Sequence, residues 1–143
     1  MSVQTILKMK GSKVVTVDAG TTAREAAQVM QHHDIGALIV TNGGRTAGVL
    51  TQRDLAYGLA RHGPQLLTMR GKDLMQPSFI SISPEQGAKA VMSVMTRRRV
   101  THIPVLDGDR LVGIVSIGDI IKDRLRDLEL ETGVLRDAYI AVH

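Results

Sequence analysis

One seven-residue motif that could bind a ligand occurs twice in this sequence. It reads Gly48-Val-Leu-Thr-Gln-Arg-Asp54 and then Gly113-Ile-Val-Ser-Ile-Gly-Asp119. In both copies a hydroxyl residue precedes the aspartate by three positions. At the start of a helix, such a carboxylate can accept hydrogen bonds from two adjacent hydroxyl groups, and free backbone N–H groups nearby attract phosphate. The motif therefore predicts a site for a ligand that carries a vicinal diol and a phosphate.

The same spacing also has a purely structural interpretation. Thr51 and Ser116 are residue types that cap helix N-termini, and an acidic residue three positions later completes the capping pattern. A gene duplication would copy a helix cap as readily as a binding site. The two interpretations can hold together, and the sequence leaves both open.

The motif belongs to a longer internal repeat that contains no gaps. Asp119 lies 65 positions after Asp54, and the same shift carries Gly43 onto Gly108. A fixed period is the sequence signature of repeated structural units. Two copies are too few for a solenoid, so we predict two half-domains related by a pseudo-twofold axis, with two related clefts between them.

The apolar pattern of each repeat predicts the order β-α-β-β-α, which makes the expected fold class α/β (α+β). In the first repeat we expect strands at 14–17, 37–40 and 46–50, a helix with an apolar stripe at 23–30, and a helix from 52 to about 61. In the second we expect strands at 79–82, 102–106 and 111–115, a helix that begins at 83–86 with Ser83 as N-cap, and a helix from 117. Asn42-Gly43-Gly44 and Asp107-Gly108-Asp109 predict hairpin turns.

Three segments follow from this division of the chain. Residues 1–65 comprise the first repeat with a short N-terminal helix at 3–9, residues 66–124 a linker and the second repeat, and residues 125–143 a helical tail. We expect the tail to be interrupted at Gly133. Its apolar residues need a surface to cover, in the same subunit or in a partner: Leu128, Leu135, Tyr139 and Ile140.

Composition narrows the classes of function. The 143 residues include no cysteine and no tryptophan, two tyrosines and one phenylalanine, and the net charge is +4. Thiol catalysis and cysteine-based zinc sites are excluded, whereas an anionic partner is permitted. Nucleic acid is not the expected partner, because single-strand binders use aromatic stacking platforms. No apolar run could span a bilayer and no secretory signal is evident, so we expect no membrane partner and a cytoplasmic location.

Motifs for catalysis and for metal binding are also missing from the sequence. It contains no phosphate-binding GxxxxGK[ST] loop and no GxGxxG after a strand, so we expect a protein that is not an enzyme. His32 and His33 are adjacent on a helix and have no evident third ligand, so we expect no metal site. Two interpretations remain for Arg97-Arg98-Arg99: cations that stabilise a helix C-terminus, or cations that reach a phosphate.

From about Val3 to Lys122 the sequence resembles a tandem pair of cystathionine-β-synthase (CBS) domains, a Bateman module. The matching parts are the element order, residues 35–40, 100–107 and 111–116, and Gly118-Asp119. The tail is similar to that of stand-alone bacterial proteins with two CBS domains. This resemblance implies two clefts between the repeats, each able to hold an adenosine-containing ligand such as AMP, ADP, ATP, NAD or S-adenosylmethionine.

The resemblance also implies which residues bind. Asp54 and Asp119 would hold the ribose hydroxyls, with Thr51 and Ser116 beside the ribose or phosphate. Adenine would lie against the first two strands of each repeat: Val14, Val15, Gly36, Ala37 and Leu38, and Phe79, Ile80, Thr101, His102, Ile103 and Pro104. The repeats depart from each other and from the family pattern around the phosphate, where Arg53 in the first copy corresponds to Gly118 in the second. We therefore expect unequal clefts, and first binding in one that includes His102 and Asp119.

These expectations combine into one predicted function. The chain would be a non-enzymatic, homodimeric sensor of an adenine nucleotide or NAD-like compound, without a catalytic cofactor, in which the ligand changes a surface for a regulated protein partner. Two alternatives stay open: a constitutive scaffold with vestigial clefts, and a weak binder of polyanions or nucleic acid.

Overall fold

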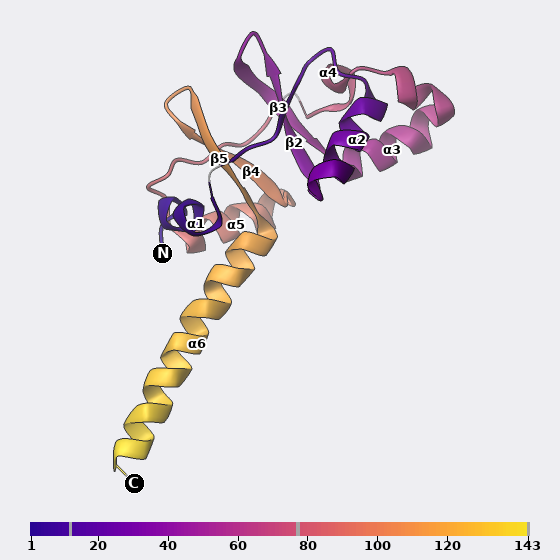
Figure 1. Cartoon of the computed structure of the whole chain (residues 1–143). Coiled ribbons are helices and arrows are strands. Elements are labelled where there is room, and N and C mark those ends of the chain that lie inside the picture. The colour runs from indigo at the N-terminus through magenta and orange to yellow at the C-terminus, as the bar shows by residue number, and fades with distance from the viewer. Residues whose placement is uncertain (12, 77, 143) are drawn as a thin grey trace.

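From α2 onward, the elements of the second repeat follow those of the first at a constant shift of 65 residues. Figure 1 shows the resulting two hairpins with their helices. The computed structural model describes residues 1–11, 13–76 and 78–142, and from 134 onward only the helical backbone. The first repeat consists of β1 (Thr16–Asp18), α2 (Ala23–His33), β2 (Ala37–Asn42), β3 (Arg45–Thr51) and α3 (Gln52–His62). The second consists of α5 (Ala88–Arg98), β4 (His102–Asp107), β5 (Arg110–Ser116) and α6 (Ile117–Val142).

The repetition extends to the register of the strands. In the β2–β3 hairpin Ala37 pairs with Thr51, and in the β4–β5 hairpin His102 pairs with Ser116. Each ladder has an irregularity at the corresponding position, after Val40 and after Val105. The predicted α/β class with two repeats is therefore confirmed.

Two short helices outside the repeats connect the two halves, because each packs on the half that does not directly follow it in the sequence. α1 (Val3–Lys10) precedes the first repeat but packs on β5 of the second, where Val3, Ile6 and Leu7 are buried in its core. α4 (Gly71–Leu74) precedes the second repeat but packs on α2 and β3 of the first. Each half thus completes its apolar core with a helix that comes before the other half. The predicted linker at 66–78 includes this α4 and the end of a 3-10 helix, η1 (Gly63–Thr68).

The strand predicted at 79–82 does not form. Only Ile82 makes a bridge to Val105, whereas β1 of the first repeat pairs with β2 over three residues. The cause is Pro104, which stands where the first repeat has Ile39. The Ile39 N–H donates to the Val15 carbonyl at 3.2 Å, and proline has no N–H with which to make the corresponding bond.

Two predictions about helix boundaries are also wrong. α5 begins at Ala88 with Gly87 as its N-cap, and Ser83–Gln86 forms a turn in which the Ser83 N–H donates to the Gln86 side-chain oxygen at 2.8 Å. The turn's backbone carbonyls accept hydrogen bonds from the first turn of α1, so these residues cap a helix other than the predicted one. α6 continues through Gly133, because one glycine costs a helix only about 1 kcal/mol.

Three apolar clusters hold the fold together. One lies inside each repeat, and the third lies between the repeats, where Ala37, Ile39 and Val49 pack with Phe79 and Ile114 among others. The third cluster brings the end of β3 close to the segment that precedes α5. Among the described residues, no helix has the length and apolar character needed to cross a bilayer.

A prediction arises from the close approach of α4 to β3. A Cβ at Gly48 would lie 2.7 Å from the Met75 sulfur and 2.8 Å from the Gln76 carbonyl oxygen, and the backbone oxygen cannot easily move. We expect Gly48→Ala to lower the free energy of unfolding by about 1–3 kcal/mol. At the equivalent Gly113 the three atoms nearest to such a Cβ all belong to the Leu7 side chain, which can move more easily than backbone. Gly113→Ala should therefore cost less, and urea unfolding that ranks the two variants in the opposite order would contradict this.

Candidate functional site

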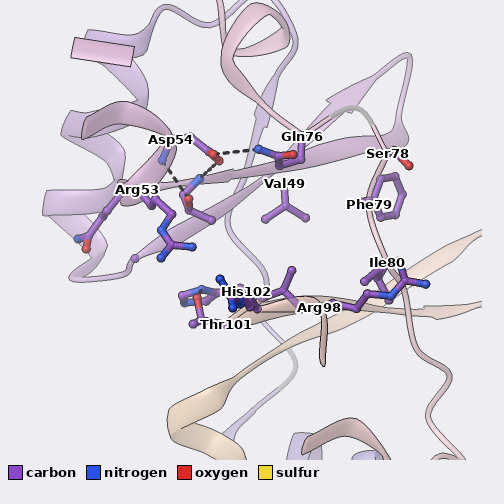
Figure 2. Close-up of a pocket in the computed structure, with 15 residues that line it drawn as sticks. Val49, Arg53, Asp54, Gln76, Ser78, Phe79, Ile80, Arg98, Thr101 and His102 are labelled. Atoms are coloured by element: carbon purple, nitrogen blue, oxygen red, sulfur yellow. Dashed lines mark hydrogen bonds between the residues drawn. The ribbon is translucent and has the colours of Figure 1, made fainter. Parts of the chain in front are cut away.

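A cavity of about 530 Å³ lies between the two repeats (Figure 2). Its first wall is the end of β3 and the start of α3, and its second wall is formed by residues that precede and follow α5. Eight predicted site residues line it: Gly36, Thr51, Arg53, Asp54, Phe79, Ile80, Thr101 and His102. Seven lining residues were absent from the predicted set: Val49, Gln52, Gln76, Ser78, Arg98, Arg99 and Val100.

The first motif both caps α3 and faces this cavity. Asp54 Oδ2 accepts a hydrogen bond from the Thr51 N–H at 2.9 Å, and Thr51 Oγ1 accepts one from the Asp54 N–H at 3.2 Å. This is a complete capping box, so the structural interpretation of the motif is correct. Among the described residues, the other carboxylate oxygen, Oδ1, accepts a single longer hydrogen bond of 3.3 Å, from the Gln76 amide (Figure 2). Oδ2 therefore caps the helix, and Oδ1 can accept a hydrogen bond from a ligand hydroxyl in place of the Gln76 amide.

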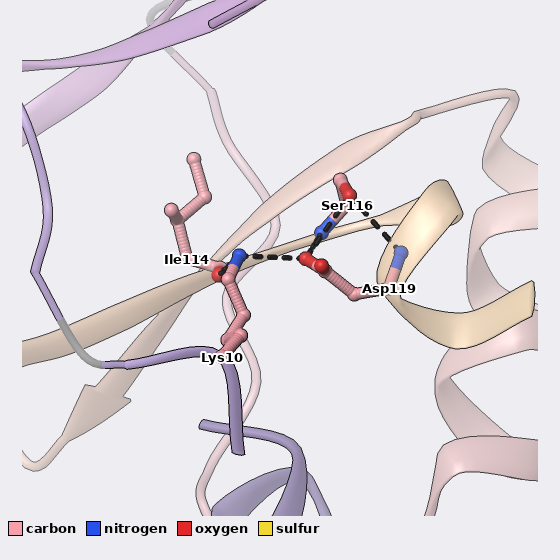
Figure 3. Close-up of polar contacts among 4 residues, drawn as sticks. All are labelled: Lys10, Ile114, Ser116 and Asp119. Carbon is pink, nitrogen blue, oxygen red and sulfur yellow. Dashed lines mark hydrogen bonds and ion pairs between the residues drawn. The ribbon is translucent and has the colours of Figure 1, made fainter. Parts of the chain in front are cut away.

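The second motif has the same cap but a different neighbour. The Ser116 N–H donates to Asp119 Oδ2 at 2.8 Å, and the Asp119 N–H donates to Ser116 Oγ at 3.2 Å. Lys10 from the end of α1 places its ammonium 2.6 Å from Asp119 Oδ2 and donates a second bond of 3.0 Å to the Ile114 carbonyl (Figure 3). This carboxylate is thus already paired with a cation, whereas Asp54 contacts a neutral amide.

The other predicted residues lie outside the cavity. Leu38 and Ile103 are 0 % and 1 % exposed in the apolar cores of their repeats, and Pro104 is also fully buried. Side chains alternate along a strand, so at least one of two neighbouring strand residues must face away from a given cleft. Ala37 and Val14 belong to the cluster between the repeats, and Val15 packs on the core of the first repeat. Ser116, Gly118 and Asp119 lie at the junction of β5 and α6 and do not line the cavity.

His102 and Asp119 therefore do not share the cavity as the sequence led us to expect. His102 begins β4 and lines the same space as Asp54 of the first repeat. Sequence alone could not show this pairing, because it depends on how the two hairpins pack through the apolar cluster between the repeats.

The cavity is rich in groups that attract an anion. Arg53, Arg98 and Arg99 line it, and among the described lining residues Asp54 is the one that is acidic. Arg99 ends α5 in a left-handed conformation (φ 54°), as Asp34 ends α2 in the first repeat (φ 53°). Arg98 and Arg99 thus line the cavity and also stand at the C-terminus of α5, so both interpretations of the arginine run stay open. Guanidinium groups can form paired hydrogen bonds with phosphate oxygens.

The surroundings of His102 favour the neutral form of its imidazole. Burial lowers the pKa of its imidazole below the ordinary value; nearby Asp119 opposes this effect and Lys10 adds to it. Its Nδ1 lies 3.0 Å from the Thr101 hydroxyl. For Asp119, burial disfavours the charged form, but hydrogen bonds from Lys10 and Ser116 outweigh burial, so the pKa of this carboxyl is lowered.

These shifts predict how stability depends on pH. Because the pKa of His102 is lower in the folded state, the unfolded chain takes up the proton first, and stability falls as the pH decreases below about 6.5. We expect His102→Gln to lose less unfolding free energy between pH 7 and pH 5 than the native chain, measured by urea titration at both values. The Asp119 contribution is lost only at lower pH, since its folded pKa is depressed, and so it cancels in this comparison. An equal or greater loss in the variant would contradict the expectation.

The histidine pair at the end of α2 is not part of this site. The rings of His32 and His33 are 5.0 Å apart and nearly perpendicular, and both residues are exposed. Within residues 1–11, 13–76 and 78–133, no three side chains of the metal-ligating types His, Cys, Asp and Glu are close enough to share an ion.

The sequence and the fold of this chain are both similar to those of known proteins. A family model described as "CBS domain" matches residues 8–61 and again residues 72–126. The CBS domain-containing protein YhcV of Bacillus subtilis is 26% identical over 132 residues, which are 92% of this chain and 94% of that protein. Hypoxic response protein 1 of Mycobacterium tuberculosis is 34% identical over 76% of this chain and 77% of its own length. The crystal structure of a CBS-domain containing protein from Agrobacterium tumefaciens superposes with a TM-score of 0.85 at 35% identity, over 87% of this chain and 99% of that one.

Proposed function

This chain belongs to the CBS-domain family, and on that premise we propose that it is a sensor whose inter-repeat cavity binds an adenosine-containing ligand. Proteins of this family are generally regulatory and nucleotide-binding. The observation that carries the proposal is the position of Asp54. Its Oδ1 faces a cavity of about 530 Å³ while Oδ2 completes the helix cap, so it can bind hydroxyls without loss of the cap.

Three chemical features of the cavity support an adenosyl ligand. Asp54 offers an acceptor for the two hydroxyls of a ribose. Apolar lining residues, Val49, Phe79, Ile80 and Val100, offer a slot for adenine. The arginines, Arg53, Arg98 and Arg99, offer donors for phosphate. The volume lies within the range of about 300–1,000 Å³ that is common for small-molecule pockets.

The proposed role is regulatory and not catalytic. The cavity takes its walls from both repeats, so a ligand that contacts both favours the arrangement in which they are close. Such a ligand shifts the population only by its difference in affinity for the two arrangements. A homodimer, a regulated protein partner and a cytoplasmic location belong to the same proposal; the absence of cysteine fits a reducing compartment.

The two motif copies also support unequal sites. Lys10 neutralises Asp119, so a ligand that bound there through its ribose would first have to displace an ion pair at 2.6 Å. Asp54 requires only the exchange of a 3.3 Å bond from Gln76. We propose one ligand per chain, bound at Asp54.

A thermal-shift screen of AMP, ADP, ATP, NAD and S-adenosylmethionine tests this function. A true ligand at one hundred times its Kd should stabilise the fold by about 2.7 kcal/mol. The 2′-deoxy form of the best ligand is the matched control and should bind more weakly, because it lacks one of the two hydroxyls. No shift with any adenosyl compound would favour a scaffold with vestigial clefts. Binding of nucleic acid that falls steeply with salt would favour a polyanion binder.

A further inference from the structure

Arg53 occupies a position in its helix that does not suit a cation. It is the second residue of α3, and the N-terminus of a helix carries a partial positive charge that disfavours a positive side chain. None of the ion pairs between described residues includes Arg53. In Figure 2 its side chain reaches from the start of α3 toward Thr101 and His102 on the second wall of the cavity. Residues that break a local preference in this way are often functional.

The ring of Tyr57, one turn further along α3, contacts this arginine. The central carbon of the Arg53 guanidinium lies 5.7 Å from the centroid of the Tyr57 ring. Residues four apart are neighbours on a helix surface, and a cation within about 6 Å of the face of an aromatic ring is attracted to it. Tyr57 is 55 % exposed and does not line the cavity. An effect of this ring on a ligand in the cavity therefore passes through Arg53.

The contact leaves the guanidinium available to an anion. Within the described part of the chain, the side-chain hydrogen bonds donated by arginine come from Arg70 and Arg126, and none comes from Arg53. Long side chains lose conformational freedom when they bind, and a contact that orders them beforehand reduces that cost. Tyr57 thus orders a cation whose donors have no partner among the described residues.

The second repeat has no equivalent of this pair. The shift of 65 residues carries Arg53 onto Gly118 and Tyr57 onto Lys122. The pair therefore occurs in the copy of the motif that faces the cavity, and it is missing from the copy in which Lys10 neutralises the aspartate.

We propose that Tyr57 is a positioning residue, which holds the Arg53 guanidinium ready for a phosphate group of the ligand. This inference rests on the proposed function, because it assigns the anionic part of that ligand to the same cavity. It also narrows the class of ligand. A phosphorylated adenosyl compound gains affinity from the pair, whereas adenosine and S-adenosylmethionine, which carry no phosphate, gain none.

NMR spectroscopy of the full chain tests the contact without any ligand. The ring current of Tyr57 should displace the side-chain resonances of Arg53 from the range of a solvated arginine. Tyr57→Phe keeps the ring and should keep the displacement. Tyr57→Leu should abolish it, and α3 should persist because leucine is a good helix former. Identical Arg53 resonances in the native chain and in Tyr57→Leu would overturn the proposal.

Titration with inorganic pyrophosphate, AMP and adenosine tests the role of the contact. Tyr57→Leu should weaken pyrophosphate and AMP by about two- to fivefold, the range for a contact of this kind at an exposed site, and should leave adenosine unchanged. Tyr57→Phe should bind all three probes as the native chain does. Leu59→Ala is the matched control, because Leu59 is 54 % exposed on the same helix and does not line the cavity. In an Arg53→Gln background, Tyr57→Leu should have no further effect.

Failure of the positioning role is distinguishable from failure of the adenosyl sensor. The role is overturned if the native chain does not bind pyrophosphate, if Tyr57→Leu binds it with native affinity, or if the loss persists in the Arg53→Gln background. AMP binding that does not depend on Tyr57 would leave the sensor standing without this role. Pyrophosphate binding that depends on Tyr57, in a chain that binds no adenosyl compound, would support the role and overturn the sensor.

Discussion

Asp54→Asn is expected to weaken adenosyl-ligand binding by about 10- to 100-fold, the loss that follows when a hydrogen bond to a charged group worth about 1.5–3 kcal/mol is removed. The substitution keeps an oxygen that can accept the Thr51 N–H bond of 2.9 Å, so the cap on α3 and the fold should persist. Isothermal titration with the best ligand from the screen measures the affinity, and urea unfolding measures the stability.

Asp119→Asn is the matched control for this variant. Its carboxylate has the same place in the second motif but pairs with Lys10 and lies outside the cavity. We expect ligand affinity to stay within about twofold of the native value, while stability declines because a charge-assisted bond is lost. Loss of binding in Asp119→Asn but not in Asp54→Asn would move the ligand to the second motif. If neither substitution changed affinity, the motifs would be helix caps only.

Most of the fold could be predicted because it depends on local patterns in the sequence. Apolar spacing identified the hairpins and the helices of both repeats, and the constant shift of 65 residues identified their pairing into equivalent halves. The predictions of secondary structure were wrong where one residue removes a backbone hydrogen bond, or where a segment distant in the sequence makes hydrogen bonds to the predicted element. Pro104 removes the N–H that would have anchored a strand at 79–82, and α1 takes the carbonyls of the turn at 83–86.

The site was less predictable than the fold. The motif residues Thr51 and Asp54 were identifiable, since their spacing carries both the cap and the ligand chemistry. Gln76 and Lys10 were not, because each reaches a motif carboxylate from a segment outside the repeat. These two residues make the motif copies unequal, one beside a neutral amide and the other beside an ammonium. A comparison of the two repeats alone cannot detect a difference that is imposed from outside them.

Two strand residues show a second reason why the sequence could not locate every side chain of the site. A family resemblance assigned Leu38 and Ile103 to adenine, but a strand with one face in the core must bury alternate side chains. The backbone of such residues can still lie near a cleft while the side chain stabilises the fold. Substitution of the side chain separates these two roles.

Leu38→Ala is therefore expected to lower the free energy of unfolding by about 2–5 kcal/mol, the usual cost of a cavity left by a fully buried leucine. The folded fraction should bind the ligand with nearly native affinity, because the Leu38 side chain packs in the core of the first repeat and does not line the cavity. Urea unfolding gives the first quantity, and titration under stabilising conditions gives the second.

Ile80→Ala should show the opposite balance. Ile80 is only partly buried against the core of the second repeat, and it lines the cavity. Its truncation should cost less stability than Leu38→Ala but weaken the ligand by about 5- to 30-fold, in proportion to the apolar contact removed. If Leu38→Ala instead reduced affinity more than Ile80→Ala, the adenine would have to lie behind β2, and the cavity between the repeats would not be its binding site.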